Sequence, residues 1–225
     1  MAKDPRVAEA IAWLEQRGSK KVREEALTRY GITAPKSFGV KVGDVQALAK
    51  KLGRDHGLAA ELWATGWYEA RLLCAYVDDP AKVTTAQMRK WAKDFDNWGI
   101  CDTICLALFD RVPDAWALVE PWSKAKGEFE KRTAFAMIAG VAVHRRATEA
   151  QLRKGLQLCE RAATDERNFV RKGVSWALRA VGTRGGKTLH AATFDVATRL
   201  AASEDKTARA IGKEALRDLK KSKGG

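Results

Sequence analysis

The stretch VRKGVSWALR, residues 170–179, has an arginine in its first turn followed by small and apolar residues with helical spacing. Two other stretches share this character, KRTAFAMIAG (131–140) and ARAIGKEALR (208–217). Their arginines, Arg132, Arg171 and Arg209, are 39 and 38 residues apart. That period is typical of two-helix HEAT-like units, which stack because one unit cannot bury its apolar face alone.

Helical periodicity runs through the rest of the chain as well, and strand patterns are nearly absent. The sequence therefore predicts an all-α protein, an α-solenoid of divergent HEAT-like repeats with a basic concave face. The repeat register is imperfect in the first half. We expect one domain over residues 1–220, a flexible basic tail at 221–225 and an ordered loop at 31–43. Helices are expected at 5–17, 20–30, 43–54, 57–65, 68–78, 84–94, 98–110, 114–122, 128–145, 149–163, 167–181, 187–202 and 206–220, with glycine or proline at most joints.

The charge is strongly positive and unevenly placed. The 225 residues carry a net charge of +13, and 46% of them are apolar, which excludes wholesale disorder. Residues 1–122 hold 18 Lys and Arg against 17 Asp and Glu, whereas residues 123–225 hold 23 against 11. The excess in the second half indicates a polyanionic partner, and nucleic acid is the first candidate.

Several function classes are disfavoured. The N-terminus lacks the pattern of a secretory signal, and the longest apolar run, at 134–143, is too short to span a bilayer. The glycine-rich stretch at 181–188 lacks the spacing of a nucleotide-binding loop. We therefore expect no membrane contact, no metal and no cofactor in a protein of the bacterial cytoplasm, nucleoid-associated when bound to DNA. The cysteines, expected to be buried free thiols, are Cys74, Cys101, Cys105 and Cys159.

The helix around residues 165–182 carries a large aromatic residue away from its expected buried stripe. Trp176 lies about 145° from the centre of that stripe, and Lys172 and Arg179 share its face. An indole between two cations suits a charged polymer, although Trp176 could instead fill a gap in the next repeat. The expected stripe consists of Val170, Val174, Ala177, Leu178 and Val181.

The stretch FDNWGICDTICLALFD, residues 95–110, raises a similar question. Trp98 and Asp102 lie one turn apart on the face beside the expected core positions, close enough to contact one ligand. Asn97 or Asp96 can cap this helix, so Asp102 is not needed as a cap. Taken alone, the pair is weak evidence for chemistry and favours a purely structural role. The expected core positions are Cys101, Ile104, Cys105 and Leu108.

The block DFDNWGICDTIC, followed by KRTAFAMIAG and NFVRKGVSWALR, resembles the AlkD family of alkylpurine DNA glycosylases in order and spacing. The resemblance includes FGVKVGDVQALAKKLG and WYEARLLCAYVDDP and covers most of residues 25–218. It implies a HEAT-like solenoid that holds duplex DNA and excises cationic bases such as 3-methyladenine and 7-methylguanine. By this resemblance Asp102 matches the catalytic carboxylate, Trp98 and Trp176 match indoles at the lesion deoxyribose, and Arg132 matches an arginine at the DNA backbone.

The implied reaction needs few groups. An N3- or N7-alkylated purine is cationic and leaves as a neutral base, so the barrier is mainly the cost of an oxocarbenium-like sugar, which a carboxylate stabilises. Gly99 departs from the larger or acidic residue common in the family, which weakens the helix start. Further predicted DNA contacts are Lys131, Arg171, Lys172, Arg179, Arg145, Arg146, Arg184 and Lys187. Arg145 and Arg146 could instead serve the helix dipole, and Arg71 is left open.

The sequence thus predicts a monofunctional DNA glycosylase, acting as a monomer on duplex DNA that contains alkylated bases. A non-catalytic HEAT-like protein that binds DNA structures is the alternative. A protein-binding solenoid fits the charge least well. Trp63, Trp67, Trp91, Trp116 and Trp122 are expected to pack between helices.

Overall fold

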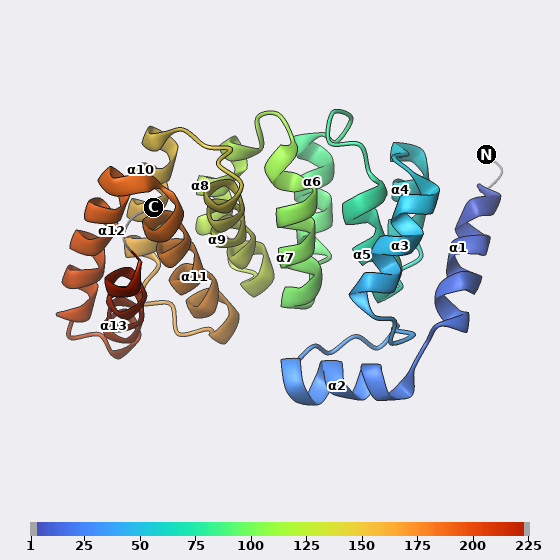
Figure 1. Cartoon of the computed structure of the whole chain (residues 1–225), viewed down its shortest axis with the longest axis horizontal. Coiled ribbons are helices and arrows are strands. Elements are labelled where there is room, and N and C mark those ends of the chain that lie inside the picture. The colour runs from blue at the N-terminus through green and yellow to red at the C-terminus, as the bar shows by residue number, and fades with distance from the viewer. Residues whose placement is uncertain (1–3, 223–225) are drawn as a thin grey trace. The chain divides into compact units, whose positions relative to one another are not determined.

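The computed structural model describes residues 4–222 and divides between Pro113 and Asp114 into two compact units, called unit 1 and unit 2 below. Every regular element within the described residues is a helix, so the all-α prediction is confirmed (Figure 1). The expectation of one domain over 1–220 stays a prediction. Residues 223–225 of the predicted tail lie outside the described part, whereas Lys221 is still helical.

Unit 1 is built from short helices joined by loops. Helix α5 packs against α3, α4 and α7, and α1 contacts α4 and α5. These helices are α1 (Pro5–Gln16), α2 (Lys20–Tyr30), α3 (Val42–Leu52), α4 (His56–Ala64), α5 (Tyr68–Val77), α6 (Thr85–Lys93), α7 (Trp98–Ala107) and the 3-10 helix η1 (Phe109–Arg111).

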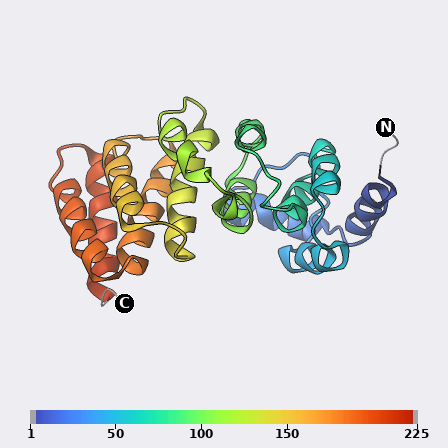
Figure 2. The same ribbon diagram turned by 90° about the horizontal axis from the view of Figure 1, so that it is seen from above.

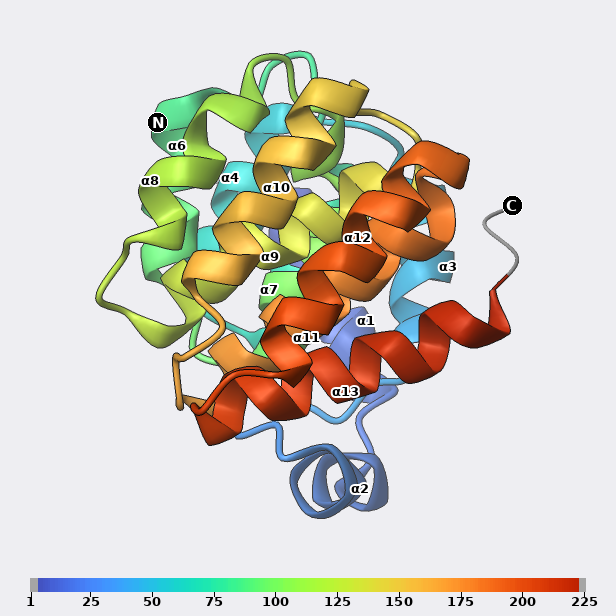
Figure 3. The ribbon, with the colours of Figure 1, turned by 90° about the vertical axis from the view of Figure 1, so that its left-hand side faces the viewer.

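Unit 2 has longer helices, and its helices stand side by side in Figure 2. Helix α11 packs against α9, α12 and α13, and α13 crosses α11 and α12 (Figure 3). The elements are η2 (Ala115–Leu118), α8 (Val119–Ser123), α9 (Glu128–Val143), α10 (Glu149–Arg161), α11 (Asn168–Arg184), α12 (Gly186–Ala201) and α13 (Lys206–Lys221).

Seven of the described α-helices begin where a short polar side chain accepts a hydrogen bond from a backbone N–H of the first turn. Thr148 and Gln151 form a complete capping box at α10, and Asp205 accepts from two amides of α13. Such caps satisfy donors that have no partner inside the helix, each worth about 1 kcal/mol. Side-chain caps of the same kind are made by Asp4, Ser19, Asp55, Thr84 and Asn97.

Unit 2 confirms the repeat predicted from the three arginine-led stretches. Ser175 donates to Glu214, Arg179 pairs with Asp218 and Arg199 pairs with Glu160, and each pair is separated by 39 residues. The polar contacts between neighbouring repeats thus have the same spacing as the sequence repeat. Each helix therefore contacts the equivalent helix of the next repeat, as stacking requires.

Unit 1 has a shorter spacing, which explains the imperfect register. Trp63 donates its indole N–H to Asp94, 31 residues away, and Gln46 donates to Tyr76, 30 residues away. The repeats of unit 1 are therefore several residues shorter than those of unit 2. A single period could not align both halves.

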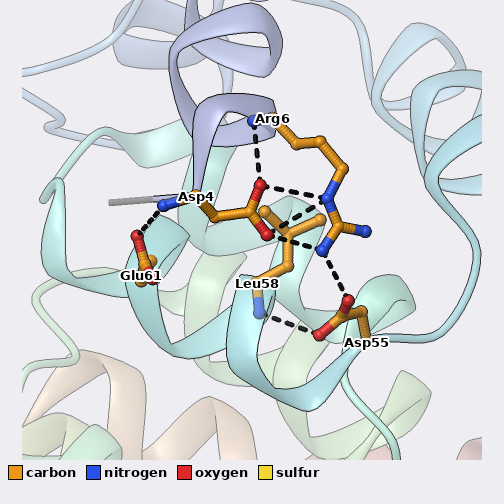
Figure 4. Close-up of polar contacts among 5 residues, drawn as sticks. All are labelled: Asp4, Arg6, Asp55, Leu58 and Glu61. Atoms are coloured by element: carbon orange, nitrogen blue, oxygen red, sulfur yellow. Dashed lines mark hydrogen bonds and ion pairs between the residues drawn. The ribbon is translucent and has the colours of Figure 1, made fainter. Parts of the chain in front are cut away.

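The first helix is tied to α4 by an arginine between two carboxylates (Figure 4). The Arg6 guanidinium contacts Asp4 and reaches Asp55 at 2.7 Å. Hydrogen bonds from Arg6 lower the pKa of Asp4. The pKa of Asp55 is lowered mainly by the hydrogen bond from the Leu58 amide and, to a smaller extent, by the one from Arg6. The Asp4 amide also donates to Glu61 at 3.0 Å, so the N-terminal helix is attached at two points.

The bounds of three predicted helices were wrong. The helix predicted at 167–181, with Gly182 as its joint, continues to Arg184; a Cβ at Gly182 would collide with Leu219 and Thr193, so the glycine permits close helix packing. The helix predicted at 98–110 ends at Ala107 and gives way to η1, and the one predicted at 114–122 is a 3-10 turn followed by α8. No helix within the described residues is long and apolar enough to cross a bilayer.

The irregular segment after α2 is ordered, as predicted, because a buried carboxylate holds it. Glu69 of α5 is fully buried. Its carboxylate accepts hydrogen bonds from the Ser37 hydroxyl and the Gly39 amide, both at 2.7 Å. The amides of Phe38 and Val40 add bonds of 3.1 and 3.2 Å. Such convergence of donors stabilises a buried negative charge and fixes the loop on α5.

Replacing Glu69 by Gln tests this role. The amide group of Gln turns an acceptor into a donor facing backbone N–H groups, so we expect the free energy of unfolding to fall by about 3 kcal/mol. Urea unfolding followed by tryptophan fluorescence measures the change. Glu24→Gln, an exposed glutamate of α2 in a 3.7 Å pair with Lys20, is the matched control and should change stability by less than about 0.5 kcal/mol. Equal effects of the two changes would contradict the role of Glu69.

Candidate active site and nucleic-acid interface

Helix α7 of unit 1 holds the predicted catalytic pair. Asn97 caps the helix by accepting from the Ile100 amide at 3.0 Å, so the cap does not use Asp102. The predicted core positions Cys101, Ile104, Cys105 and Leu108 are fully buried. Trp98 and Asp102 are half-buried and lie one turn apart, off that buried stripe. The burial pattern predicted for this segment is therefore confirmed, whereas the chemical role of Asp102 is not tested by it.

The Trp98 indole is anchored by the end of α2. Its Nε1–H donates to the Tyr30 carbonyl at 2.9 Å. Tyr30 is the last residue of α2, and Gly31 follows in the left-handed conformation, φ +62°. This turn ends the helix and leaves the Tyr30 carbonyl without an intrahelical partner, which the indole supplies.

Gly99, the departure from the family pattern, has a structural reason. A Cβ at position 99 would lie 2.6 Å from the Tyr68 hydroxyl and 3.1 Å from Ile32 Cδ1. The Tyr68 ring is rigid, so it cannot yield as a flexible chain would. The position of Tyr68, at the start of α5, therefore favours a residue without a Cβ at position 99 of α7.

Unit 2 holds the other predicted indole. The predicted stripe of α11, consisting of Val170, Val174, Ala177, Leu178 and Val181, is fully buried. Trp176 is half-buried and Lys172 is exposed, with its ammonium group 5.8 Å from the Phe169 ring centroid. The choice between a packing role and a binding role for Trp176 stays open.

Three of the predicted DNA contacts have partners inside unit 2. Lys131 Nζ lies 2.9 Å from Asp165, and Arg179 lies 2.8 Å from Asp218 on α13. Arg132 is only 6% exposed and donates to the Phe169 carbonyl at 2.6 Å. These side chains join neighbouring repeats, so cations without such partners are better candidates for direct DNA contacts.

The remaining predicted cations lie at the surface. Arg145, in the left-handed conformation at φ +56°, lines a cavity of about 390 Å³ together with Arg184 and the start of α12. Lys172, Arg146 and Lys187 are exposed, and Arg171 is half-buried. An exposed basic face on α13 was not predicted. It consists of Lys213, Arg217 and Lys220, whose spacing of four and three residues places them on one face of a helix.

Asp165 is the centre of an ion-pair cluster in unit 2. Its carboxylate accepts from Arg167 at 2.6 Å and pairs with Lys131. These hydrogen bonds, of which the one from Arg167 has the largest effect, hold the pKa of Asp165 far below its usual value. Arg167 also donates to the Lys126 carbonyl at 2.6 Å, which ties the start of α11 to the loop before α9.

The cysteines are buried free thiols, as predicted. Burial raises the pKa of Cys74 and of Cys159, so these thiols stay protonated and do not act as nucleophiles. Within residues 4–222 no group of three or more His, Cys, Asp or Glu side chains is arranged to hold a metal ion. Three of the predicted packing tryptophans, Trp63, Trp91 and Trp122, are buried.

The described helices form HEAT-like repeats, with a carboxylate and an indole on α7 and basic side chains on the later helices. The chain belongs to the DNA alkylation repair enzyme family, whose pattern it matches over residues 11–219. No curated protein is similar enough in sequence to count as a match.

Two solved structures resemble the fold. One is described as "A new family of proteins related to the HEAT-like repeat DNA glycosylases with affinity for branched DNA structures"; it is 18% identical, with a TM-score of 0.77 over 94% of each chain. The other is smu.31 from Streptococcus mutans UA159, 17% identical, with a TM-score of 0.52 over 93% of this chain and 97% of the other. At identities this low, the structural similarity shows a shared fold alone. The HEAT-like architecture predicted from the sequence is thus confirmed.

The tight approach of Gly99 to Tyr68 predicts a coupled pair of substitutions. Gly99→Ala should lower the free energy of unfolding by about 1–3 kcal/mol, because the methyl group meets the Tyr68 hydroxyl. Adding Tyr68→Phe removes that oxygen and should recover part of the loss. Chemical unfolding of the four proteins in this double-mutant cycle gives the coupling energy, and strictly additive effects would contradict the contact.

The lowered pKa of Asp165 predicts a pH dependence. A carboxyl whose folded pKa lies below the unfolded value of 3.8 adds stability above that pH and loses it as the pH falls towards the folded pKa. Asp165→Asn should therefore cost about 2 kcal/mol at pH 7, and the difference from the wild-type protein should shrink below about pH 4. Urea unfolding at pH 7 and pH 3 measures this, and an equal difference at both pH values would contradict it.

Proposed function

We propose that this chain is a monofunctional DNA glycosylase that hydrolyses the N-glycosidic bond of cationic N3- or N7-alkylated purines in duplex DNA. Asp102 is the carboxylate that stabilises the sugar, and Trp98 and Trp176 contact the lesion deoxyribose. The observation that carries the proposal is the α7 arrangement, in which Asp102 lies half-buried one turn after an anchored indole. Membership in the alkylation repair family supports it.

The proposed chemistry uses electrostatics rather than acid catalysis. The alkylated purine already carries a positive charge, so it departs as a neutral base without being protonated. The sugar develops the charge of an oxocarbenium ion, and a carboxylate held near C1′ lowers the energy of that charge and orients the attacking water. The electron-rich indole faces add about 0.5–2 kcal/mol each.

The position of Asp102 suits this task. Partial burial strengthens its field, because fewer water dipoles screen the charge. Its place on the second turn of a capped helix fixes the side chain relative to Trp98. The hydrogen bond from Trp98 to the Tyr30 carbonyl fixes the orientation of the indole.

Duplex binding is assigned to the exposed cations of unit 2. Lys172, Arg184 and Lys187 are exposed and have no carboxylate within ion-pair distance among residues 4–222. Contacts of this kind release counterions from DNA and carry no sequence information. Binding should therefore weaken steeply with salt.

A second candidate function is recognition of DNA structure without base excision. The similar structure with affinity for branched DNA favours it, because a protein of the same fold binds such DNA. This reading predicts salt-sensitive binding to junctions with no release of any alkylated base. One assay that measures free base and retained DNA separates the two functions.

Replacing Asp102 by Asn tests the leading proposal. The amide keeps the shape and removes the charge, so the rate of 7-methylguanine release from methylated duplex should fall by at least about 100-fold. Affinity for the duplex should change less than about threefold, because exposed cations elsewhere provide it. Single-turnover release followed by chromatography gives the rate, and a filter-binding titration gives the affinity.

Asp195→Asn, an exposed aspartate of α12, is the matched control and should release base at the wild-type rate. Equal release by the wild-type protein and Asp102→Asn would remove Asp102 from the mechanism. Tight junction binding without release by the wild-type protein would favour the second function.

A further inference from the structure

Unit 1 contains a cavity that none of the predicted site residues explains. Its volume is about 340 Å³, within the size range of small-ligand sites. It opens at the starts of α5 and α7 and is bordered by the loop that follows α2. The polar side chains around it are Lys36, Tyr68, Arg71, Asp96 and Asn97.

Two of these side chains are cations whose charge no carboxylate balances. Arg71 is half-buried; one of its terminal nitrogens donates to the Asp94 carbonyl at 3.2 Å, and its guanidinium lies 5.1 Å from the Trp63 ring. Within residues 4–222 no carboxylate lies within 4 Å of Arg71 or Lys36, and the Arg71 Nε is buried without a hydrogen-bond partner. A partly desolvated cation without a counter-charge is unfavourable, and an anion in the cavity would relieve that cost.

Tyr68 adds a neutral donor. Burial, and then the nearby charges of Glu69 and Asp96, raise the pKa of its phenol, so the group keeps its proton at physiological pH. Its hydroxyl lies at the start of α7, 2.6 Å from the position that a Cβ of residue 99 would take. A protonated phenol beside two cations can donate to an oxygen of an anion without adding repulsion.

The other walls set the size and nature of the ligand. Ala34, Pro35 and Ile100 add apolar lining, which suits contact with a sugar. Asp96 is the one acidic lining residue; it is exposed, and its carboxylate accepts from the Asn97 amide at 2.7 Å. A lining that combines three donors with apolar residues matches a sugar phosphate better than a bare base.

We propose that this cavity is a binding site for a phosphate ester, with Lys36, Arg71 and Tyr68 holding the phosphate oxygens and the apolar residues contacting the attached sugar. The phosphate can come from a strand end, from the backbone of bound DNA or from a free sugar phosphate. In each case the donors recognise the same tetrahedral oxyanion. Asp102 does not line this cavity, and binding there does not depend on base release.

Titration of the full chain with 2-deoxyribose 5-phosphate, followed by NMR of arginine Nε–H and backbone amides, tests the proposal. We expect saturable shifts at Arg71, Gly66 and Ile100, with 2-deoxyribose alone giving none. Lys36→Gln should weaken binding about tenfold and Tyr68→Phe about fivefold, reflecting one charged and one neutral donor. Lys51→Gln, an exposed lysine of α3, is the matched control and should leave the affinity unchanged.

No saturable shift at these residues, or equal weakening by Lys36→Gln and Lys51→Gln, would overturn the proposal. Competition by duplexes identifies the source of the phosphate: a 5′-phosphorylated duplex that competes better than a 5′-hydroxyl duplex indicates strand ends, and equal competition indicates backbone phosphates. Either result supports the site. Because base release is measured separately, failure here leaves the proposed chemistry of Asp102 untouched.

Discussion

Each two-helix repeat of this protein has an apolar face that only the neighbouring repeat can cover, and this constraint organises both units. In unit 2 the buried stripe of α11 lies against α9, α12 and α13, and no helix could keep that stripe out of water alone. The polar contacts between repeats follow the same spacing. Arg199 pairs with Glu160 at a separation of 39 residues, as Ser175 does with Glu214. Hydrophobic burial holds the repeats together, and these polar pairs fix their register.

The same constraint explains how far the sequence predicts the structure. Helices were predictable because burial imposes a 3.6-residue period, and the stripes of α7 and α11 have the burial expected from that period. The place of Asp102 beside Trp98, off the core stripe, followed from the same geometry. Gly182 was misread because a glycine that breaks a helix and a glycine that admits a neighbouring helix look alike in sequence. The difference lies in Leu219 and Thr193, which come from other helices.

Contacts between residues far apart in the chain could not be predicted from the sequence. Nothing near Glu69 indicates that its carboxylate faces four donors some 30 residues earlier in the chain. Nor does position 98 indicate that its indole finds the Tyr30 carbonyl, 68 residues away. These two contacts fix the loop and the end of α2 against the helices that carry the candidate site. The precision of the site therefore comes from tertiary contacts, whereas the choice of helix face comes from local spacing.

The fate of the basic side chains shows why net charge alone does not locate a binding surface. Lys131, Arg167 and Arg179 contribute to the positive excess of the second half, yet each lies within hydrogen-bonding distance of an aspartate. Their fields are largely cancelled at a distance, and a polyanion would have to break those pairs to use them. Lys172 and Arg184 have no such partner among the described residues, and the same holds for Lys36 and Arg71 in unit 1. Whether a cation can bind phosphate thus depends on the absence of a nearby carboxylate, which is a property of the folded chain rather than of its composition.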